Sequence, residues 1–294
     1  MSYVVDAHFH VWSTKTHPWL KNVVGGGHIA GDFAPIIEYS IDDYIKDARP
    51  AGVAKAVHVE TVIDPLEETR FLSELPSKNE LGFPQGIVAH CDLHADDAAR
   101  ILEAQSKYER VRGIRQLLDY HPTCKELRQA PHDKFLDDPA WLKGLALLEK
   151  YNFSFDMHVT YNQMERASRV IGNHPNIQFI IDHNGLPYDK DEETVKAWQE
   201  GLKKISQNSN VAIKLSGYAM LDRYWTAEST KPLIEFTVTT FGADRCMFAS
   251  NYPVDKINST YQGCLDALKA NIARFSDAEQ TNILAKTAER VYRI

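Results

Sequence analysis

The stretch FSFDMHV at residues 153–159 is followed by IQFIID at 177–182 and by VAIKL at 211–215. Each run is short and almost continuously apolar, which is typical of strands buried on both faces of a parallel sheet. Between them, residues 163–172 and 192–208 carry apolar side chains at helical spacing. This part of the chain therefore predicts strand, helix, strand, helix and strand, which is the repeating order of an α/β fold.

The same alternation extends over the whole chain. Eight strands are expected, at 3–6, 54–59, 86–91, 111–114, 153–159, 177–182, 211–215 and 246–249. Helices are expected at 44–48, 66–75, 96–106, 139–151, 163–172, 192–208, 232–241, 261–270 and 276–286. The first helix has the pattern of a capping box, because Ser40 precedes Asp43 by three residues, and the second follows Asp64-Pro65.

Eight strands that each precede a helix, with no linker and no shift in composition, favour one closed (β/α)8 TIM barrel over residues 1–294. The alternative is a doubly wound open sheet. That fold lacks support, since no GxGxxG motif follows the first strand and Gly25-Gly26-Gly27 lies in a long loop. Segments 13–40 and 116–138 are too long for simple connections, so we expect them to fold over the mouth of the barrel.

The composition argues against several classes of protein. Lys and Arg number 33 and Asp and Glu number 40, a formal charge of −7 without runs of like charge, so we expect no nucleic-acid partner. No apolar stretch approaches the roughly 18 residues of a membrane span, and the N-terminus does not read as a secretion signal. The four cysteines are widely spaced and form no CxxC pair, so we expect them to be buried thiols. We expect a cytoplasmic protein with a small-molecule substrate. Whether the chain forms a homo-oligomer stays open.

Polar side chains gather where the expected strands end. The first strand ends in DAHFH at 6–10, and the others end in HVE at 58–60, HCD at 90–92, RGIR at 112–115, DMH at 156–158, DHN at 182–184, KLS at 214–216 and SNY at 250–252. The carboxyl ends of barrel strands surround one mouth, where catalytic groups collect. His8 and His10 lie two residues apart on an extended chain, so both imidazoles face the same side and suit a divalent metal or a carbonyl oxygen. Histidines in loops, such as His28, are expected to be solvated.

Four motifs carry a resemblance to a known family. They are DAHFHVW at 6–12, RGIR at 112–115, DHNGLP at 182–187 and KLSG at 214–217. In their order and spacing they resemble the amidohydrolase superfamily, of the amidohydrolase 2 type, and within it the branch of sugar-lactone and 2-pyrone-4,6-dicarboxylate lactonases. The resemblance covers essentially the whole chain and implies a TIM-barrel hydrolase.

The resemblance also implies roles for single residues. His8, His10 and His183 are expected to line the active site, and Arg115 to bind carboxylate or hydroxyl groups of the substrate. Metal use differs among such relatives: some hold zinc through the HxH pair, a strand-five His and a strand-eight Asp, whereas others need no metal. The cofactor is therefore expected to be either none or one divalent metal, zinc, with His8, His10 and His158 as its ligands.

The chain departs from the family at strand eight, where Asn251 stands in place of the expected Asp. In relatives this carboxylate takes a proton from the attacking water. A carboxamide has no such proton acceptor near neutral pH and is a weaker ligand for zinc. The base is then expected elsewhere, with His183 as the first candidate and Asp255 as the second.

Arg115 and Lys214 predict a locally positive mouth in an acidic protein, which favours an anionic or polyhydroxylated small molecule. Lys214 lies in an apolar strand, and a buried lysine is costly unless it is paired. It therefore indicates either function or an internal ion pair with Asp156 or Glu60. Substrate contacts are expected from Arg115, Lys214, Asn251 and Tyr161.

Three functions are compatible with these residues. The leading one is a hydrolase that opens a small lactone or related carboxylic ester with activated water, while His8 and His10 polarise the carbonyl. The second is a zinc-dependent decarboxylase or hydrolase of the same superfamily. The third is a barrel that binds a ligand without hydrolysing it.

Overall fold

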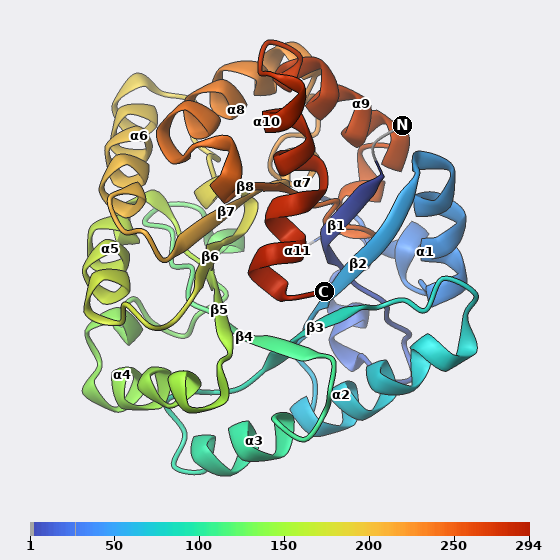
Figure 1. Cartoon of the computed structure of the whole chain (residues 1–294), viewed down its shortest axis with the longest axis vertical. Coiled ribbons are helices and arrows are strands. Elements are labelled where there is room, and N and C mark those ends of the chain that lie inside the picture. Colours follow the sequence, from blue (N-terminus) through green and yellow to red (C-terminus); the bar gives the residue numbers. More distant parts are fainter. Residues whose placement is uncertain (1–2, 27) are drawn as a thin grey trace.

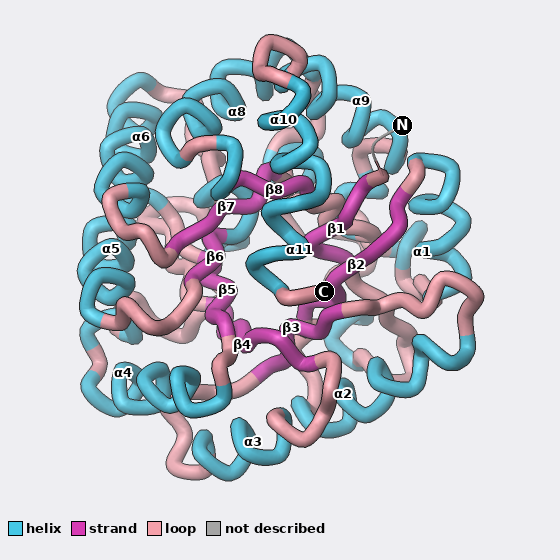
Figure 2. Tube along the Cα trace, in the orientation of Figure 1, coloured by secondary structure: helices cyan, strands magenta, loops and turns pink. Residues whose placement is uncertain are grey.

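The computed structural model describes residues 3–26 and 28–294, which form eight parallel strands in the order of the sequence. The strands are β1 Val4–Phe9, β2 Val53–Val59, β3 Gly86–His90, β4 Val111–Leu117, β5 Ser154–His158, β6 Phe179–Ile181, β7 Val211–Leu215 and β8 Cys246–Phe248. The ring closes beyond β8, where Asn251 N donates to His8 O over 2.8 Å and His10 N donates to Tyr252 O over 2.7 Å. Figures 1 and 2 show the strands in the centre with the helices outside them. The predicted (β/α)8 TIM barrel is confirmed.

The helices largely follow the predicted ones. They are α1 Ile41–Ala48, α2 Pro65–Glu74, α3 Ala98–Gln105, α4 Pro139–Ala146, α5 Met164–Asn173, α6 Glu192–Ser206, α7 Tyr218–Leu221, α8 Ala227–Phe241, α9 Tyr261–Ile272, α10 Asp277–Thr281 and α11 Thr287–Tyr292. The capping box of α1 is formed, because Asp43 N donates to Ser40 Oγ and Ser40 N donates to the Asp43 carboxylate. Helix α8 begins five residues before the predicted start at 232, since Thr226 accepts the N–H of Ser229 and starts the helix ahead of Pro232.

Two strands extend further than the sequence predicts. The predicted strands end at 6 and 114, because polar residues follow. In the structure β1 continues to Phe9, which pairs with His58, and β4 continues to Leu117, which pairs with His158. The polar side chains form hydrogen bonds and ion pairs inside the barrel, so the pairing between strands continues beyond them. His8 and Arg115 therefore lie on rigid strands and not on loops.

The C-terminal helix α11 closes the end of the barrel where the strands begin. Ile294 lies against Gly86 at the start of β3, and Figure 1 shows α11 across the barrel opening. The Tyr292 hydroxyl donates to Asp156 Oδ2 over 2.7 Å inside the barrel. The buried apolar cluster here contains Val5, Ala7, Val57, Val59, Val88, Ile180, Ala212, Met247, Ala288, Val291 and Tyr292. Among the described residues, the opposite end of the barrel, where the strands finish, is therefore the end that this helix leaves open.

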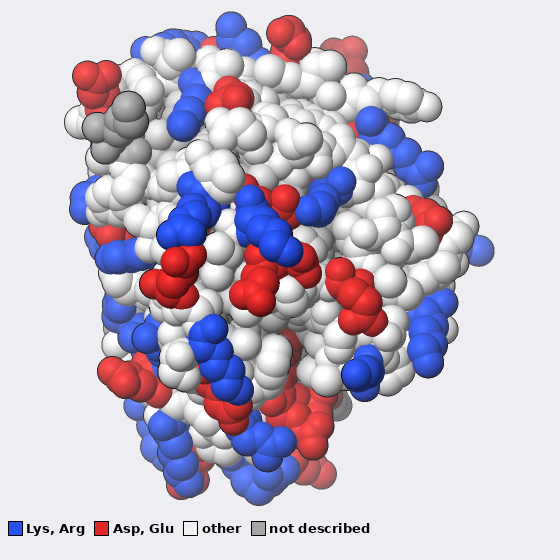
Figure 3. Space-filling model, turned by 90° about the vertical axis from the view of Figure 1, so that its right-hand side faces the viewer, with Lys and Arg blue, Asp and Glu red and all other residues white. Residues whose placement is uncertain are grey.

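The surface is less distinctive than the interior. Figure 3 shows Lys and Arg interspersed with Asp and Glu over the face that it views, without a patch of one sign. Within the described ranges, no helix combines the length and the hydropathy that spanning a bilayer requires.

Candidate active site

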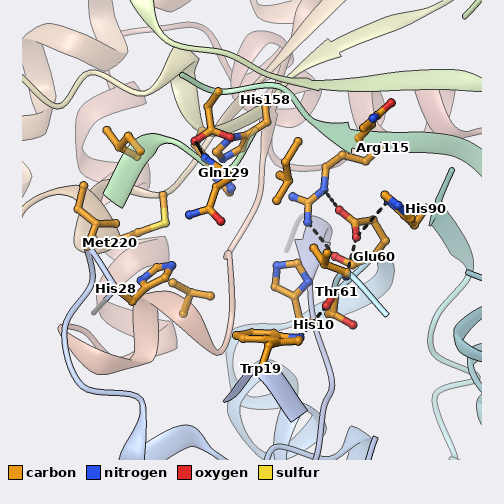
Figure 4. A pocket seen from close by; sticks show the side chains of 18 of the residues that line it. His10, Trp19, His28, Glu60, Thr61, His90, Arg115, Gln129, His158 and Met220 are labelled. Carbon is orange, nitrogen blue, oxygen red and sulfur yellow. Dashed lines mark hydrogen bonds and ion pairs between the residues drawn. The ribbon is translucent and has the colours of Figure 1, made fainter. Parts of the chain in front are cut away.

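A cavity of about 480 Å³ lies at the mouth of the barrel, between the strand ends and the two long segments that were expected to cover them. Segment 13–40 contributes Trp19, His28 and Phe33, and segment 116–138 contributes Asp119 and Gln129, among others. Figure 4 shows side chains of both the strand ends and these segments around the same hollow. The strand ends contribute His10, Glu60, His90, Arg115, His158, His183 and Asn251.

His8 and His10 face each other at the end of β1, with 3.1 Å between their Nε2 atoms. His10 Nδ1 lies 2.8 Å from the carbonyl oxygen of Val59, which only accepts, so Nδ1 carries the proton and Nε2 is the acceptor. This assignment makes His8 Nε2 the donor to His10. Burial lowers the pKa of both imidazoles well below the ordinary value, and the nearby cations Lys214 and Arg115 lower it further. Both side chains are therefore neutral.

Lys214 lies beneath the HxH pair in a buried ion cluster. Its Nζ is 2.5 Å from Asp156 Oδ2, 2.8 Å from Asp182 Oδ1 and 3.2 Å from His8 Nδ1, and its side chain is fully buried. Burial acts to raise the pKa of Asp182, but Lys214 and His8 outweigh it and hold that pKa well below its usual range. Of the two alternatives for Lys214, the structure thus supports the internal ion pair. Lys214 is not among the described residues that line the cavity, in contrast to its expected substrate contact.

Arg115 does line the cavity, but its guanidinium is occupied. Its Nε donates to Glu60 Oε1 over 2.7 Å, its Nη2 donates to Glu60 O over 2.8 Å, and its Nη1 is 3.4 Å from Asp182 Oδ2. Burial acts to raise the pKa of Glu60, yet Arg115 and His90 lower it overall, so the carboxylate is ionised. The positive charge of Arg115 is therefore balanced inside the protein, and the expected positive mouth is not formed.

His183 and His158 are held in the same way, each through Nδ1. His183 Nδ1 is 2.9 Å from Ser216 Oγ, and His158 Nδ1 is 2.9 Å from Asp119 Oδ1. Asp119 is fully buried and accepts the proton of His158 Nδ1, which leaves Nε2 as the ring nitrogen available to the cavity. His183 has a φ of 49°, and this left-handed turn directly after β6 directs its side chain to the mouth. Burial lowers the pKa of His183 well below the ordinary value.

Asp119 and His28 are two cavity residues that the sequence analysis missed. The predicted strand ends at 114, so Asp119 was assigned to a covering segment, although it follows the end of β4 by two residues. His28 was expected to be solvated, but it lines the cavity, and burial lowers its pKa to about 4. Ala30 N donates to His28 Nδ1 over 3.1 Å, so the neutral ring carries its proton on Nε2. His28 therefore offers a donor where His158 offers an acceptor.

The strand-eight residue Asn251 lines the cavity, and its Nδ2 donates to Asp255 Oδ1 over 2.9 Å. Asp255 also accepts the backbone N–H of Met220 and is buried, and burial raises its pKa to about 7. Asp255 and Tyr161 are absent from the described cavity lining, because Asp255 lies behind Asn251 and Tyr161 packs against His121. The structure thus brings His10, His183, Arg115, Asn251 and His158 together at one cavity and places His8 directly below them.

The imidazoles present fit a divalent metal such as zinc. His8 and His10 are neutral, as metal-binding imidazoles must be, and their Nε2 atoms face each other at 3.1 Å. A metal would bind the tautomer of His8 that carries its proton on Nδ1, 3.6 Å from Asp182 Oδ1. His10 has its other ring nitrogen on a protein acceptor, an arrangement that orients metal-binding imidazoles. Donor atoms of His8, Asp182 and His183 also lie within 4.8 Å of one another. Since Asp182 is already paired with Lys214, the histidines are the ligands that remain available.

A family model described as Amidohydrolase matches residues 5–294. The chain belongs to the amidohydrolase family. This amidohydrolase is 34% identical to protein y4mH of Sinorhizobium fredii, over 99% of this chain and 98% of that protein. It is 25% identical to the L-fucono-1,5-lactonase of Burkholderia multivorans, over 98% of this chain and 95% of that enzyme.

Among solved structures, an amidohydrolase from Burkholderia multivorans with bound zinc has a TM-score of 0.81 and 21% identity, with 99% of both chains covered. At this identity the likeness concerns the fold. Family membership and the lactonase relative together make the present amidohydrolase an enzyme of the hydrolase class.

Proposed function

We propose that this enzyme hydrolyses the lactone of a polyhydroxylated acid. The observation that carries the proposal is the pair formed by His158 and Asp119, an imidazole held by a fully buried carboxylate 2.9 Å away, with its other nitrogen directed to the cavity. Such a pair is suited to take a proton from water and to return it to a leaving oxygen. The 25% identity to an L-fucono-1,5-lactonase over nearly the full length supports the choice of a lactone.

His158 suits the role of base better than the other candidates do. Asn251 has no proton acceptor of suitable basicity, and Asp255 lies behind it. His183 packs against His8 with 4.6 Å between ring centroids, and burial opposes its protonation. The Asp119 carboxylate, by contrast, stabilises the positive charge that His158 acquires when it accepts a proton.

The reaction then follows from the positions of these groups. His158 Nε2 takes a proton from water as the water oxygen forms a bond to the lactone carbonyl carbon. The tetrahedral intermediate collapses with cleavage of the ring C–O bond, and the proton passes from His158 to the departing alkoxide oxygen. The product is the open hydroxy acid, which ionises. A divalent metal held by His8 and His10 would supply polarisation of the carbonyl when bound.

His28 and Arg115 have supporting roles in this proposal. The Nε2–H of neutral His28 is available to a substrate hydroxyl or carbonyl oxygen, as neutral imidazoles can polarise carbonyl groups. Glu60 holds the guanidinium of Arg115 in place, and the N–H groups of Arg115 that do not bind Glu60 are available to uncharged oxygen atoms of the substrate. Trp12, Trp19 and Phe33 form an apolar wall against which a sugar ring can pack.

The test is a panel of aldono-1,4- and aldono-1,5-lactones, with hydrolysis followed by the acid that ring opening releases. We expect saturable hydrolysis of at least one member by the purified enzyme, and a strong loss of that activity in His158→Gln. The uncatalysed rate of opening is measured in parallel. Turnover no faster than that of His158→Gln over the whole panel, with a correctly folded protein, would overturn the proposal.

A further inference from the structure

We infer that the cavity selects uncharged polyhydroxylated lactones and rejects lactones that carry a carboxylate, an inference that rests on the proposed function. Of the two substrate chemistries that the sequence left open, anionic and polyhydroxylated, the structure therefore favours the second alone.

The lining is formally negative. Among the described residues that form it, Arg115 is the one permanently charged cation and faces four carboxylates, Glu60, Asp92, Asp119 and Glu126. Four carboxylates therefore stand against one permanent cation in the described lining.

Arg115 is not free to bind a carboxylate of the substrate. Glu60 accepts from its Nε through the carboxylate and from its Nη2 through the backbone carbonyl, and Asp182 approaches its Nη1. A substrate carboxylate would have to displace Glu60, which is fully buried and would then be left as an unpaired charge. Lys214, the other cation near the mouth, is fully buried beneath the HxH pair and is bound to Asp156 and Asp182.

Among the described side chains, two of the four carboxylates, Asp92 and Glu126, are paired with neither an arginine nor a histidine. Asp92 accepts from the neutral donors Gln116 Nε2 and His94 N, at 2.9 and 3.1 Å. Glu126 accepts from the thiol of Cys124 at 3.3 Å. In the part of the chain that the structure describes, neither lies within 4.0 Å of a lysine or arginine nitrogen. Both side chains belong to exposed residues at the rim, so an approaching anion meets their field before it reaches the catalytic groups.

The rest of the lining suits a neutral sugar. Aromatic faces pack against the C–H groups of a ring, and amides and hydroxyls bind its hydroxyl groups without preference for a charge. The cavity contains both kinds of surface. The aromatic residues are Trp12, Trp19, Phe33 and Phe135, and the neutral polar residues include Thr61, Gln129 and Asn251.

The experiment compares lactones that differ in one group. D-glucono-1,4-lactone and D-glucaro-1,4-lactone have CH2OH or a carboxylate at the same carbon, and D-galactono-1,4-lactone with galactaro-1,4-lactone forms a second pair. We expect kcat/KM to be at least about tenfold lower for the carboxylated member of each pair, since like charges brought together disfavour binding. The ratio should narrow as added salt screens the rim carboxylates.

Variants connect the ratio to the named residues. Asp92→Asn and Glu126→Gln should each lower the discrimination by roughly threefold, and the double variant by more, because each removes one rim charge. Glu103→Gln is the matched control, since Glu103 is exposed on α3 and is not among the described lining residues. The control should leave the ratio at its wild-type value.

The outcomes separate this inference from the proposed function. Hydrolysis of both members at rates within about threefold of each other would overturn the charge selection and leave the lactonase proposal intact. Hydrolysis of neither member of any pair, together with no turnover across the lactone panel, would contradict the proposed function. Thermal stabilisation by the same compounds would then decide the inference: stabilisation by the neutral lactone alone supports it, and equal stabilisation by both contradicts it.

Discussion

Gly217 lies so close to His183 that a Cβ atom on residue 217 would be 2.9 Å from His183 Cβ and 3.0 Å from its Nδ1. The glycine has a φ of +76°, in the left-handed region. It follows Ser216, which holds the same Nδ1 by a hydrogen bond of 2.9 Å. The glycine of the KLSG motif is thus explained by the space and backbone that His183 needs.

Gly217→Ala should therefore displace His183 and also strain the backbone, at a cost of about 1 to 3 kcal/mol in the free energy of unfolding. Activity per folded molecule should fall as well, because the imidazole cannot keep its place. Gly52→Ala is the control: Gly52 has a φ of +80° but no atom within 4 Å of the added Cβ. The control should lose stability without loss of activity, as measured by urea unfolding and lactone hydrolysis. Equal effects of the two variants on activity would contradict this account.

Asp119→Asn should lower kcat by roughly 10² to 10⁴ with a smaller effect on KM, because the carboxamide neither fixes the tautomer of His158 nor stabilises its protonated form. The comparison variant is Asp137→Asn, a change in the same covering segment at a carboxylate paired with Arg166 and Arg169 on the surface. Steady-state kinetics of both variants, with circular dichroism to verify folding, make the test. A kcat for Asp119→Asn near that of Asp137→Asn would exclude the pair of His158 and Asp119 as the group that transfers the proton.

Asn251→Asp should leave the fold intact and raise the affinity for zinc. The new carboxylate would stand beside Asp255, 2.9 Å from the atom that now accepts from Asn251, and two such carboxyls share one proton. A divalent cation removes that constraint and gains an anionic ligand beside the histidines. Equilibrium dialysis with zinc, followed by metal analysis and a thermal shift, measures the gain against Asn22→Asp, an exposed substitution. Unchanged zinc binding would count against Asn251 as part of a metal site.

The need for a metal is tested directly by treating the wild-type protein with a chelator and measuring its activity before and after the treatment.

Glu68 should contribute less to the stability of the protein as the pH rises. Burial, and then the charge of Glu60, raise the pKa of Glu68 to about 8. A carboxyl whose pKa is higher in the folded than in the unfolded state stabilises the fold fully below the unfolded pKa and loses that contribution as pH rises to the folded pKa. We therefore expect the contribution of Glu68 to the free energy of unfolding to decrease between pH 4.5 and about 8, with a slope of at most about 1.4 kcal/mol per pH unit.

Glu68→Gln should remove this contribution, so the variant should gain stability relative to wild type as the pH rises and be the more stable of the two at pH 8. A glutamine oxygen still accepts from Thr61 N, as Glu68 Oε1 does. Glu67→Gln, on the exposed side of the same helix, should leave the profile unchanged. Urea unfolding at pH 5, 7 and 9 distinguishes the variants, and parallel profiles for wild type and Glu68→Gln would show that Glu68 is not the group concerned.

The sequence predicts the barrel well because its evidence is local. Alternating apolar runs and helices determine the strand order, and polar strand ends must then meet at one mouth, as His10, Arg115 and His183 do. Pairing across the barrel is not local. The three carboxylates that balance Lys214 and Arg115 come from β5, from the end of β2 and from the turn after β6, so the sign of charge at the mouth depends on their distances. Asp119 and His28 were missed because long connections carry no periodicity that indicates which side chains turn inward.

The docking of α11 also has a consequence for how the molecule folds. Val5 of β1 and Val291 of α11 belong to the same buried cluster, although almost the whole chain separates them in sequence. Contacts between such distant residues form late and slowly, because a long loop must close before they stabilise anything. The Asp156 carboxylate accepts a hydrogen bond from Tyr292 of this helix. The ion cluster beneath the active site is therefore complete only when the two ends of the chain have come together.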